Sequence, residues 1–150
     1  MNAWPSATYR RDRTNSEARP EGMRQMPRMS KESAAHVDDF GPAEDRHEDL
    51  DGYTVNFVTI RQGTDLAPML KGLPDDRCQC PHWGYVFKGT LTLSYAGRDE
   101  VFEAGDAFYV PPGHTPMAET GTEFVQFSPT EGLRVTDAAI MKNVQAMRGA

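Results

Sequence analysis

Closely spaced turns constrain this chain more than any other feature. From about residue 53 to residue 129, signals built from Gly, Pro and Asp interrupt the sequence at short intervals. The segments between them are rich in β-branched and aromatic residues, and they are long enough for β-strands but too short for ordinary helices. The pattern predicts an antiparallel sandwich or barrel.

The expected strands cover residues 53–60, 80–88, 90–95, 100–103, 107–110, 114–118 and 123–127. Residues 66–71 are expected to form a short edge segment, because Pro68 has no N–H to donate to a neighbouring strand. A single helix is expected near the C-terminus. There Thr136 is a candidate N-cap, and Ile140, Val144 and Met147 follow at roughly helical spacing.

The first third of the chain has a different composition. Residues 1–31 carry seven basic and three acidic residues and contain no Val, Ile, Leu or Phe, whereas residues 32–51 carry eight acidic residues against Arg46 alone. The basic piece has too little apolar surface to offset the entropy of ordering, and the acidic run is typical of a solvated linker. We therefore predict a disordered or linker extension over 1–48, a β-barrel over 49–132, and a helix and tail over 133–150.

Charge and hydropathy exclude several classes of protein. The net charge of −6 argues against a nucleic-acid-binding protein, and no apolar run approaches the ~18 residues of a membrane span. The two cysteines are too few for a disulfide-rich scaffold. Because the N-terminal segment lacks the apolar stretch of a secretory signal and thiols stay reduced in the cytoplasm, we expect a cytoplasmic protein.

Two punctuated segments resemble the motifs of the cupin superfamily. Gly105, five further residues, Pro111 and Gly113 match the second cupin motif, and the strand that ends at Gly89 and restarts at Thr90 looks like the end of the first. The resemblance covers roughly residues 52–130 and is to small single-domain cupins of an actinobacterial type. It implies an all-β fold: a single cupin barrel (a double-stranded β-helix, or small jelly roll) with a short C-terminal α-helix and a disordered N-terminal extension.

The resemblance also implies a divalent metal inside the barrel. Cupins usually hold it with two His and a Glu from the first motif and one His from the second. Here, counting forward from Gly72 or back from Gly89 places Cys78 at a ligand position, and the second count places His82 at the Glu position. The His expected in the second motif is Pro116, and His114 lies two residues before it.

The residues themselves support a Cys/His site. Cys78, Cys80 and His82 alternate, so in an extended strand they share one face, with neighbours ~6.5–7 Å apart. Cys78 and His82 are then too far apart to share an ion unless Pro81 or Gly84 bends the strand. We expect three of Cys78, Cys80, His82 and His114 to ligate. Thiolate and imidazole favour Zn²⁺, with Fe²⁺, Cu and Ni as alternatives.

Other interpretations stay open at this stage. Both cysteines are also compatible with a plain buried core, with a strained disulfide between them, or with a nucleophilic Cys80 beside a histidine. Gln126 interrupts an apolar strand and is a candidate lining residue of a pocket, together with Tyr85 and Phe108.

Three functions follow from these patterns. The first is a metal-dependent enzyme of oxygenase, isomerase or lyase type acting on a small organic molecule. The second is a non-catalytic ligand-binding or sensing cupin with a structural metal or no metal, and the third is an assembly scaffold. The resemblance implies a homodimer, since pairing covers exposed sheet edges.

Overall fold

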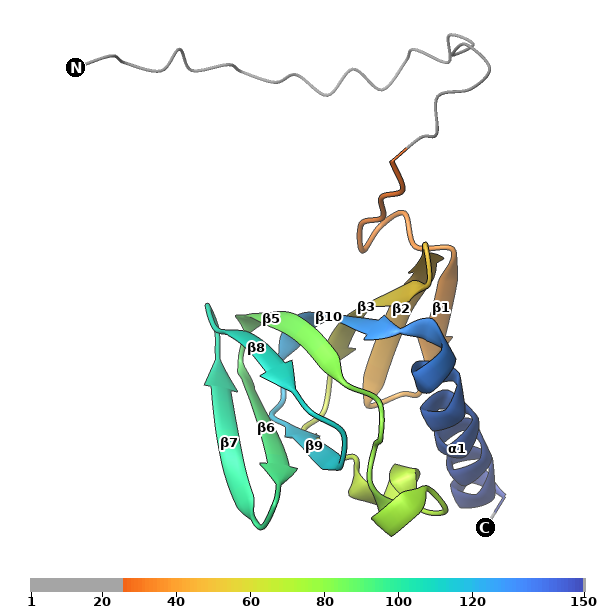
Figure 1. Ribbon diagram of the computed structural model, residues 1–150, viewed down its shortest axis with the longest axis vertical. Coiled ribbons are helices and arrows are strands. Elements are labelled where there is room, and N and C mark those ends of the chain that lie inside the picture. Colours follow the sequence, from red (N-terminus) through yellow and green to blue (C-terminus); the bar gives the residue numbers. More distant parts are fainter. Residues whose placement is uncertain (1–25, 150) are drawn as a thin grey trace, which may run out of the picture.

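Two antiparallel sheets and one helix make up the computed structural model, which describes residues 26–149 (Figure 1). The sheets pack against each other and enclose the main core, which contains Ile60, Val86, Leu91, Leu93, Phe108, Val110, Ala118 and Phe124. The elements are β1 (His36–Asp39), β2 (Ala43–Leu50), β3 (Tyr53–Ile60), β4 (Thr64–Asp65), η1 (Ala67–Leu70), η2 (Pro74–Asp76), β5 (His82–Lys88), β6 (Thr90–Tyr95), β7 (Arg98–Glu103), β8 (Ala107–Val110), β9 (His114–Ala118), β10 (Glu123–Pro129) and α1 (Thr130–Arg148).

The larger sheet has the strand order β1-β2-β3-β10-β5-β8, and the smaller sheet has the order β4-β9-β6-β7. Because β5 and β8 lie in one sheet and β6, β7 and β9 in the other, the chain crosses between sheets at its turns. Gly89 makes the crossing from β5 to β6 at φ 75°, and a Cβ there would lie 2.5 Å from Thr122 Oγ1. Only glycine fits this close approach.

The all-β prediction is confirmed. β3, β6, β8 and β9 have the expected bounds, whereas β5 begins at His82, β7 begins earlier at Arg98 and β10 continues to Pro129. The predicted disorder over residues 1–25 lies outside the described residues.

The linker expected over residues 32–48 is wrong from residue 36 onward, because β1 and β2 form there. β2 pairs with β3 along its whole length, so backbone hydrogen bonds stabilise a segment that has few apolar side chains. Arg61 compensates part of its acidity, with guanidinium nitrogens 2.7 Å from carboxylate oxygens of Asp39 and Glu44. Composition alone reveals neither this strand pairing nor these ion pairs.

Two local expectations also change. Residues 66–71 do not form an edge strand: Ala67–Leu70 form the 3₁₀-helix η1, with Pro68 in its first turn, where a missing N–H costs nothing. The C-terminal helix begins at Thr130 rather than near Thr136, and Leu133 and Thr136 are buried inside it.

Helix α1 covers a second, smaller core. Leu133 packs there with Leu70, Leu73, Cys78 and Cys80. The Asn143 amide ties the helix to η1 by donating to Met69 O at 2.7 Å and to Lys71 O at 2.9 Å. The helix therefore lies beside the segment that carries the two cysteines. None of the helices described within residues 26–149 is both long and apolar enough to cross a membrane.

Candidate metal centre

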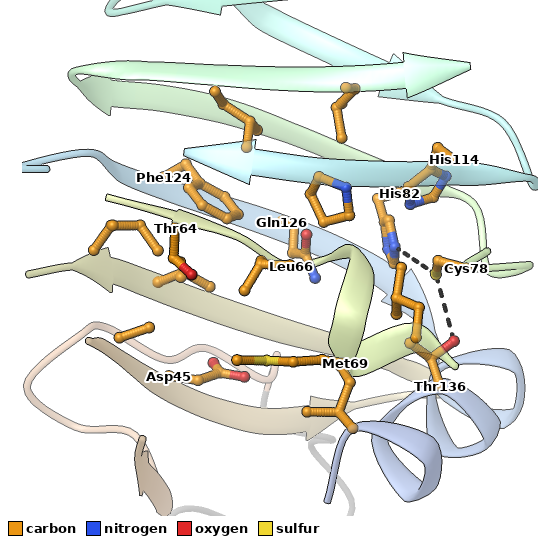
Figure 2. Close-up of a pocket in the computed structure, with 18 of the residues that line it drawn as sticks. Asp45, Thr64, Leu66, Met69, Cys78, His82, His114, Phe124, Gln126 and Thr136 are labelled. Atoms are coloured by element: carbon orange, nitrogen blue, oxygen red, sulfur yellow. Dashed lines mark hydrogen bonds between the residues drawn. The ribbon is translucent and has the colours of Figure 1, made fainter. Parts of the chain in front are cut away.

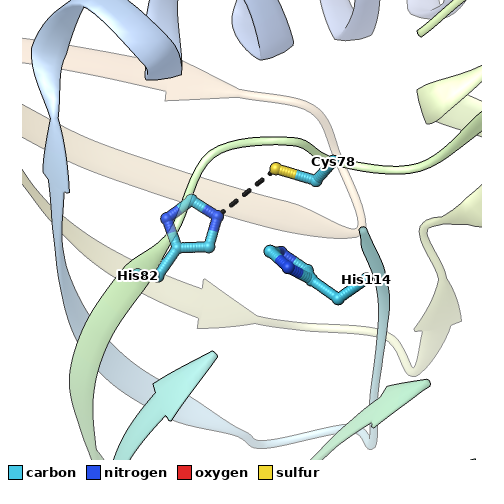
Figure 3. A group of neighbouring side chains, drawn as sticks. All are labelled: Cys78, His82 and His114. Atoms are coloured by element: carbon cyan, nitrogen blue, oxygen red, sulfur yellow. Dashed lines mark hydrogen bonds between the residues drawn. The ribbon is translucent and has the colours of Figure 1, made fainter. Parts of the chain in front are cut away.

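Three predicted ligands meet inside the barrel. One ligand atom each of Cys78, His82 and His114 lies within 4.8 Å of the others (Figure 3). All three residues are buried, with exposed fractions of 3%, 6% and 1%. Cys78 precedes β5, His82 begins β5 and His114 begins β9, so the group joins both sheets. Among the described residues, no other group of three or more His, Cys, Asp or Glu side chains brings its ligand atoms this close together.

The local backbone explains why Cys78 and His82 meet. Cys78 forms an isolated antiparallel bridge to His114, with Cys78 N donating to His114 O at 2.9 Å and Gly113 N donating to Cys78 O at 2.7 Å. The chain then bends at Cys80 before β5 starts. This bend removes the separation that an extended strand would impose between residues 78 and 82.

Hydrogen bonds orient both imidazoles. His114 Nδ1 lies 2.7 Å from the Pro111 carbonyl oxygen, which can only accept, so Nδ1 carries the proton and Nε2 keeps its lone pair. His82 Nδ1 lies 2.7 Å from Ser128 Oγ, and His82 Nε2 lies 3.4 Å from Cys78 Sγ. A carbonyl behind a histidine fixes its tautomer and improves it as a metal ligand, and Ser128 Oγ holds the His82 ring at its Nδ1.

Burial keeps both rings uncharged. It lowers the pKa of His82 to about 3, with the nearby His114 adding to the effect, and it also lowers the pKa of His114. The rings lie edge to face, with centroids 5.0 Å apart. Metal ligation requires neutral imidazole, so the site holds both histidines in the form that binds a cation.

The Cys78 thiol is buried beside helix α1. Its Sγ lies 3.4 Å from Thr136 Oγ1 and 3.7 Å from Cys80 O. Burial raises the pKa of Cys78, an effect that Thr136 partly offsets. A bound cation would reverse this preference, because metal coordination deprotonates a thiol. Two nitrogens and one sulfur form a donor set that fits Zn²⁺ and also suits Fe²⁺, Cu or Ni.

Cys80 lies outside this group. Its Sγ lies 3.8 Å from Pro129 O and would be 3.3 Å from a Cβ at Gly132, so it packs against the start of α1. Burial raises its pKa to about 12. Both cysteines are free, and no disulfide joins them. We predicted Cys80 among the ligands because residues 78, 80 and 82 share one face of an extended strand. The bend at Cys80 breaks that geometry, and its side chain packs against the start of α1 instead.

The three residues line one wall of a cavity of about 150 Å³ (Figure 2). Gln126 and Phe108, two of the predicted lining residues, also line it. Gly84 makes room for the Phe108 ring, since a Cβ there would lie 2.3 Å from Phe108 Cζ. Tyr85 is on the outer face of the larger sheet, 41% exposed, and does not line the cavity.

Two further residues that line the cavity were not predicted from the sequence. Thr136 had been considered only as a helix cap, yet it lies nearly two turns inside α1 and contacts Cys78. Asp45 was assigned to a linker, yet β2 places it in the cavity wall. No signal in the sequence marked Asp45, because its segment is mostly charged and its place in the wall depends on the pairing of β2 with β3.

Comparison with solved structures places this architecture among the cupins. An RmlC-like cupin from Shewanella frigidimarina aligns with a TM-score of 0.50 and 20% identity, over 71% of this chain and 95% of that one. A protein of unknown function from Rhizobium leguminosarum aligns with a TM-score of 0.50 and 16% identity, over 70% and 96%. KdgF from a Halomonas species reaches a TM-score of 0.47 and 21% identity, over 63% and 86%.

The chain therefore has the cupin fold, a small jelly-roll barrel, as the motifs around Gly89 and Gly105 predicted. Neither a protein-family model nor a curated protein matches the sequence.

Proposed function

We propose that this protein is a metal-binding cupin that binds or transforms a small organic molecule in its barrel. Cys78, His82 and His114 would hold the divalent cation, with zinc as the first candidate. The observation that carries the proposal is the meeting of their three ligand atoms within 4.8 Å at the wall of the cavity. The two free thiols are compatible with a reducing compartment such as the cytoplasm.

The surrounding residues support binding in defined ways. Pro111 O and Ser128 Oγ orient the two imidazoles, and burial keeps both rings neutral. Three protein ligands leave a coordination position for a water or a ligand, which distinguishes such a site from a closed structural one. A bound divalent metal would supply Lewis-acid chemistry at the cavity wall. The apolar walls would exclude water from a bound molecule.

Metal analysis of variants tests the proposal. Cys78→Ser, His82→Ala and His114→Ala should each lower zinc occupancy of the purified protein, measured by mass spectrometry and by competition with a chromophoric chelator. Losing a ligand should weaken zinc binding by at least tenfold, as even losing a residue behind a ligand typically does. Cys80→Ser is the matched control, because it removes a buried thiol two residues from Cys78 and outside the group.

The controls make the result decisive. Cys80→Ser should keep zinc occupancy, and circular dichroism should show that all four variants fold. Unchanged occupancy in the three ligand variants, or an equal loss in Cys80→Ser, would contradict the site. Absence of any metal after aerobic and anaerobic purification, with no zinc uptake on titration, would contradict the proposed function.

We also propose that the protein forms a homodimer through the outer face of the larger sheet. Six aromatic side chains there are 41–52% exposed: Tyr53, Trp83, Tyr85, Phe87, Tyr109 and Phe127. Phe127, Trp83 and Tyr109 are register neighbours across β10, β5 and β8, so the exposed surface is continuous. At 150–250 Å² per aromatic side chain, the exposed part is roughly 500 Å², more than half of the ~800 Å² that each partner buries in a standard interface.

A further inference from the structure

The cavity itself restricts which molecules fit beside the metal ligands. Its volume of about 150 Å³ matches an engineered apolar cavity that binds benzene. No Lys or Arg is among the described residues that line it, and most of the lining is aliphatic or aromatic, including Ile60, Leu93 and Phe124. A phosphate or a polyhydroxylated sugar would lose its hydrogen bonds here. The walls favour a ligand of one ring or a short branched chain.

Asp45 and Gln126, together with the hydroxyl of Thr64, interrupt these walls away from the ligand group. Asp45 comes from β2 and Gln126 from β10, and both line the cavity. Figure 2 shows Asp45 on the far side of the cavity from Cys78 and His82, with Gln126 between them in this view. A ligand held at Cys78, His82 and His114 would therefore present its opposite end to polar groups.

Asp45 is held in place with bonding capacity to spare. Asn56 Nδ2 lies 2.8 Å and 3.1 Å from the two carboxylate oxygens, and Asn56 is only 2% exposed. A carboxylate has about four lone-pair directions, so at least two remain for a donor in the cavity. Among residues 26–149, no side chain or backbone group hydrogen-bonds the Gln126 amide, which leaves it available as well. The Asp45 carboxylate accepts hydrogen bonds, and the Gln126 amide both donates and accepts them. The pair is therefore suited to a ligand hydroxyl or amine.

We propose that Asp45 and Gln126 form the recognition end of the cavity and that the ligand is a small aromatic or branched aliphatic acid. Its oxygen donor would lie at the metal, and a hydroxyl or amine would donate to Asp45. This inference rests on the proposed function, because it assigns the ligand's other end to the cation held by Cys78, His82 and His114. It goes further in naming the class of molecule and the residues that select it.

Matched probes test the ligand class. Benzoate, 3-hydroxybenzoate and 4-hydroxybenzoate share a carboxylate and a ring and differ by one hydroxyl. Calorimetric titration of the zinc-loaded protein at pH 8, where Asp45 is ionised, should show one hydroxybenzoate binding about tenfold more tightly than benzoate. A hydrogen bond to a charged group is of that strength. Asp45→Asn should reduce the preference to threefold or less, and Asp45→Asn combined with Gln126→Leu should abolish it.

Asp49→Asn is the matched control, since Asp49 lies on the same strand, bonds Thr54 and does not line the cavity. It should keep the tenfold preference, and melting temperatures should show that all variants fold. The inference is overturned if no probe binds, if neither hydroxybenzoate exceeds benzoate, or if the preference survives in the double variant.

The probes also separate this inference from the proposed function. Benzoate that binds only in the presence of zinc, without any hydroxyl preference, would support the metal site and reject the recognition end. A hydroxyl preference that persists in zinc-free protein and in His82→Ala would support Asp45 and Gln126 and reject the metal as the second anchor.

Discussion

Asp45 is an acid in a position where its charge is costly. Burial raises its pKa to about 7, the neighbouring Asp38 acts in the same direction, and the hydrogen bonds from Asn56 only partly offset them. The groups that face it are Asp38 on β1, His47 on β2, whose Nδ1 lies 4.0 Å away, and Asp137 on α1. A folded protein that prefers the protonated acid must lose stability when that proton is removed.

This shift predicts how stability depends on pH. The pKa of Asp45 is about 7 in the folded protein, against 3.8 for the free side chain. The folded state therefore binds the proton more tightly, so its contribution is complete below pH ~4 and is lost as the pH rises to about 7. Roughly 2–4 kcal/mol is at stake. Asp45→Asn should remove this dependence, as measured by urea unfolding of both proteins from pH 4 to pH 8.

The informative quantity is the difference in unfolding free energy between the wild type and Asp45→Asn, because other groups titrate in the same pH range. The pKa of Asp137 is also raised, to about 6, mainly by burial and by Asp45. Asp137→Asn serves as the comparison and should leave the dependence due to Asp45, which continues up to about pH 7. A wild-type minus Asp45→Asn difference that stays constant from pH 4 to pH 8 would show that the Asp45 carboxyl is not held in its protonated form.

Single residues also show how far the sequence could predict the site. Cys78, His82 and His114 were all candidates, because Cys and His near the cupin motifs are few. The sequence could not separate Cys80 from them, since alternation assumes an extended strand and the bend at Cys80 breaks that assumption. Asp45 was beyond prediction for another reason: its place in the cavity depends on pairing between β2 and β3.

Strands β1 and β2 are the elements that composition misjudged. Segments with few apolar residues usually stay disordered when isolated. Here the edge of β3 that does not pair with β10 needs a hydrogen-bonding neighbour, and β2 supplies one along eight register pairs from Ala43↔Ile60 to Leu50↔Tyr53. Hydrogen bonds between strands depend little on side-chain type, so a polar strand can complete a sheet. The turns that end β6, β8 and β9 carry Gly or Pro and were therefore predictable.

The pairing of β2 with β3 predicts the effect of truncation. Deleting residues 1–51 removes β1 and β2 and leaves the β3 edge unpaired, with Asn56 losing its bonds to Asp45. An unpaired, partly apolar edge promotes aggregation. We expect the 52–150 protein to lose most of its soluble yield and to melt at least 10 °C lower, because a loss of 1 kcal/mol shifts the melting temperature of such a domain by several degrees.

Deletion of residues 1–25 is the matched control, since it retains every described strand. It should melt within about 2 °C of the full chain in differential scanning fluorimetry. If the 52–150 protein matched the full chain in yield and melting temperature, β1 and β2 would be dispensable, and the barrel would begin at β3.

At the scale of the whole molecule, the two sheets differ on their outer faces. The larger sheet exposes a continuous aromatic surface, and the rings of Trp83 and Tyr109 lie 5.0 Å apart within it. Among the large apolar side chains of the smaller sheet, Val101 on β7 is 56% exposed and Met117 on β9 is 45% exposed. Monomeric proteins rarely expose large contiguous apolar patches, so the aromatic face is the one we expect a second copy to cover.

Charged substitutions on the outer faces of the two sheets test which face forms the dimer. Trp83→Glu combined with Phe127→Glu places carboxylates at the centre of the aromatic face, where burying them against a partner would cost several kcal/mol. We expect light scattering coupled to gel filtration to give a dimer for the wild type and a monomer for this variant. Val101→Glu, on the other sheet, should remain a dimer. Because the side chains of Trp83, Phe127 and Val101 are exposed on outer faces, whereas Cys78, His82 and His114 are buried, zinc content should be the same in all three proteins. A monomeric wild type would contradict the proposed dimer. A dimer that survives Trp83→Glu combined with Phe127→Glu would show that the interface is not on the aromatic face.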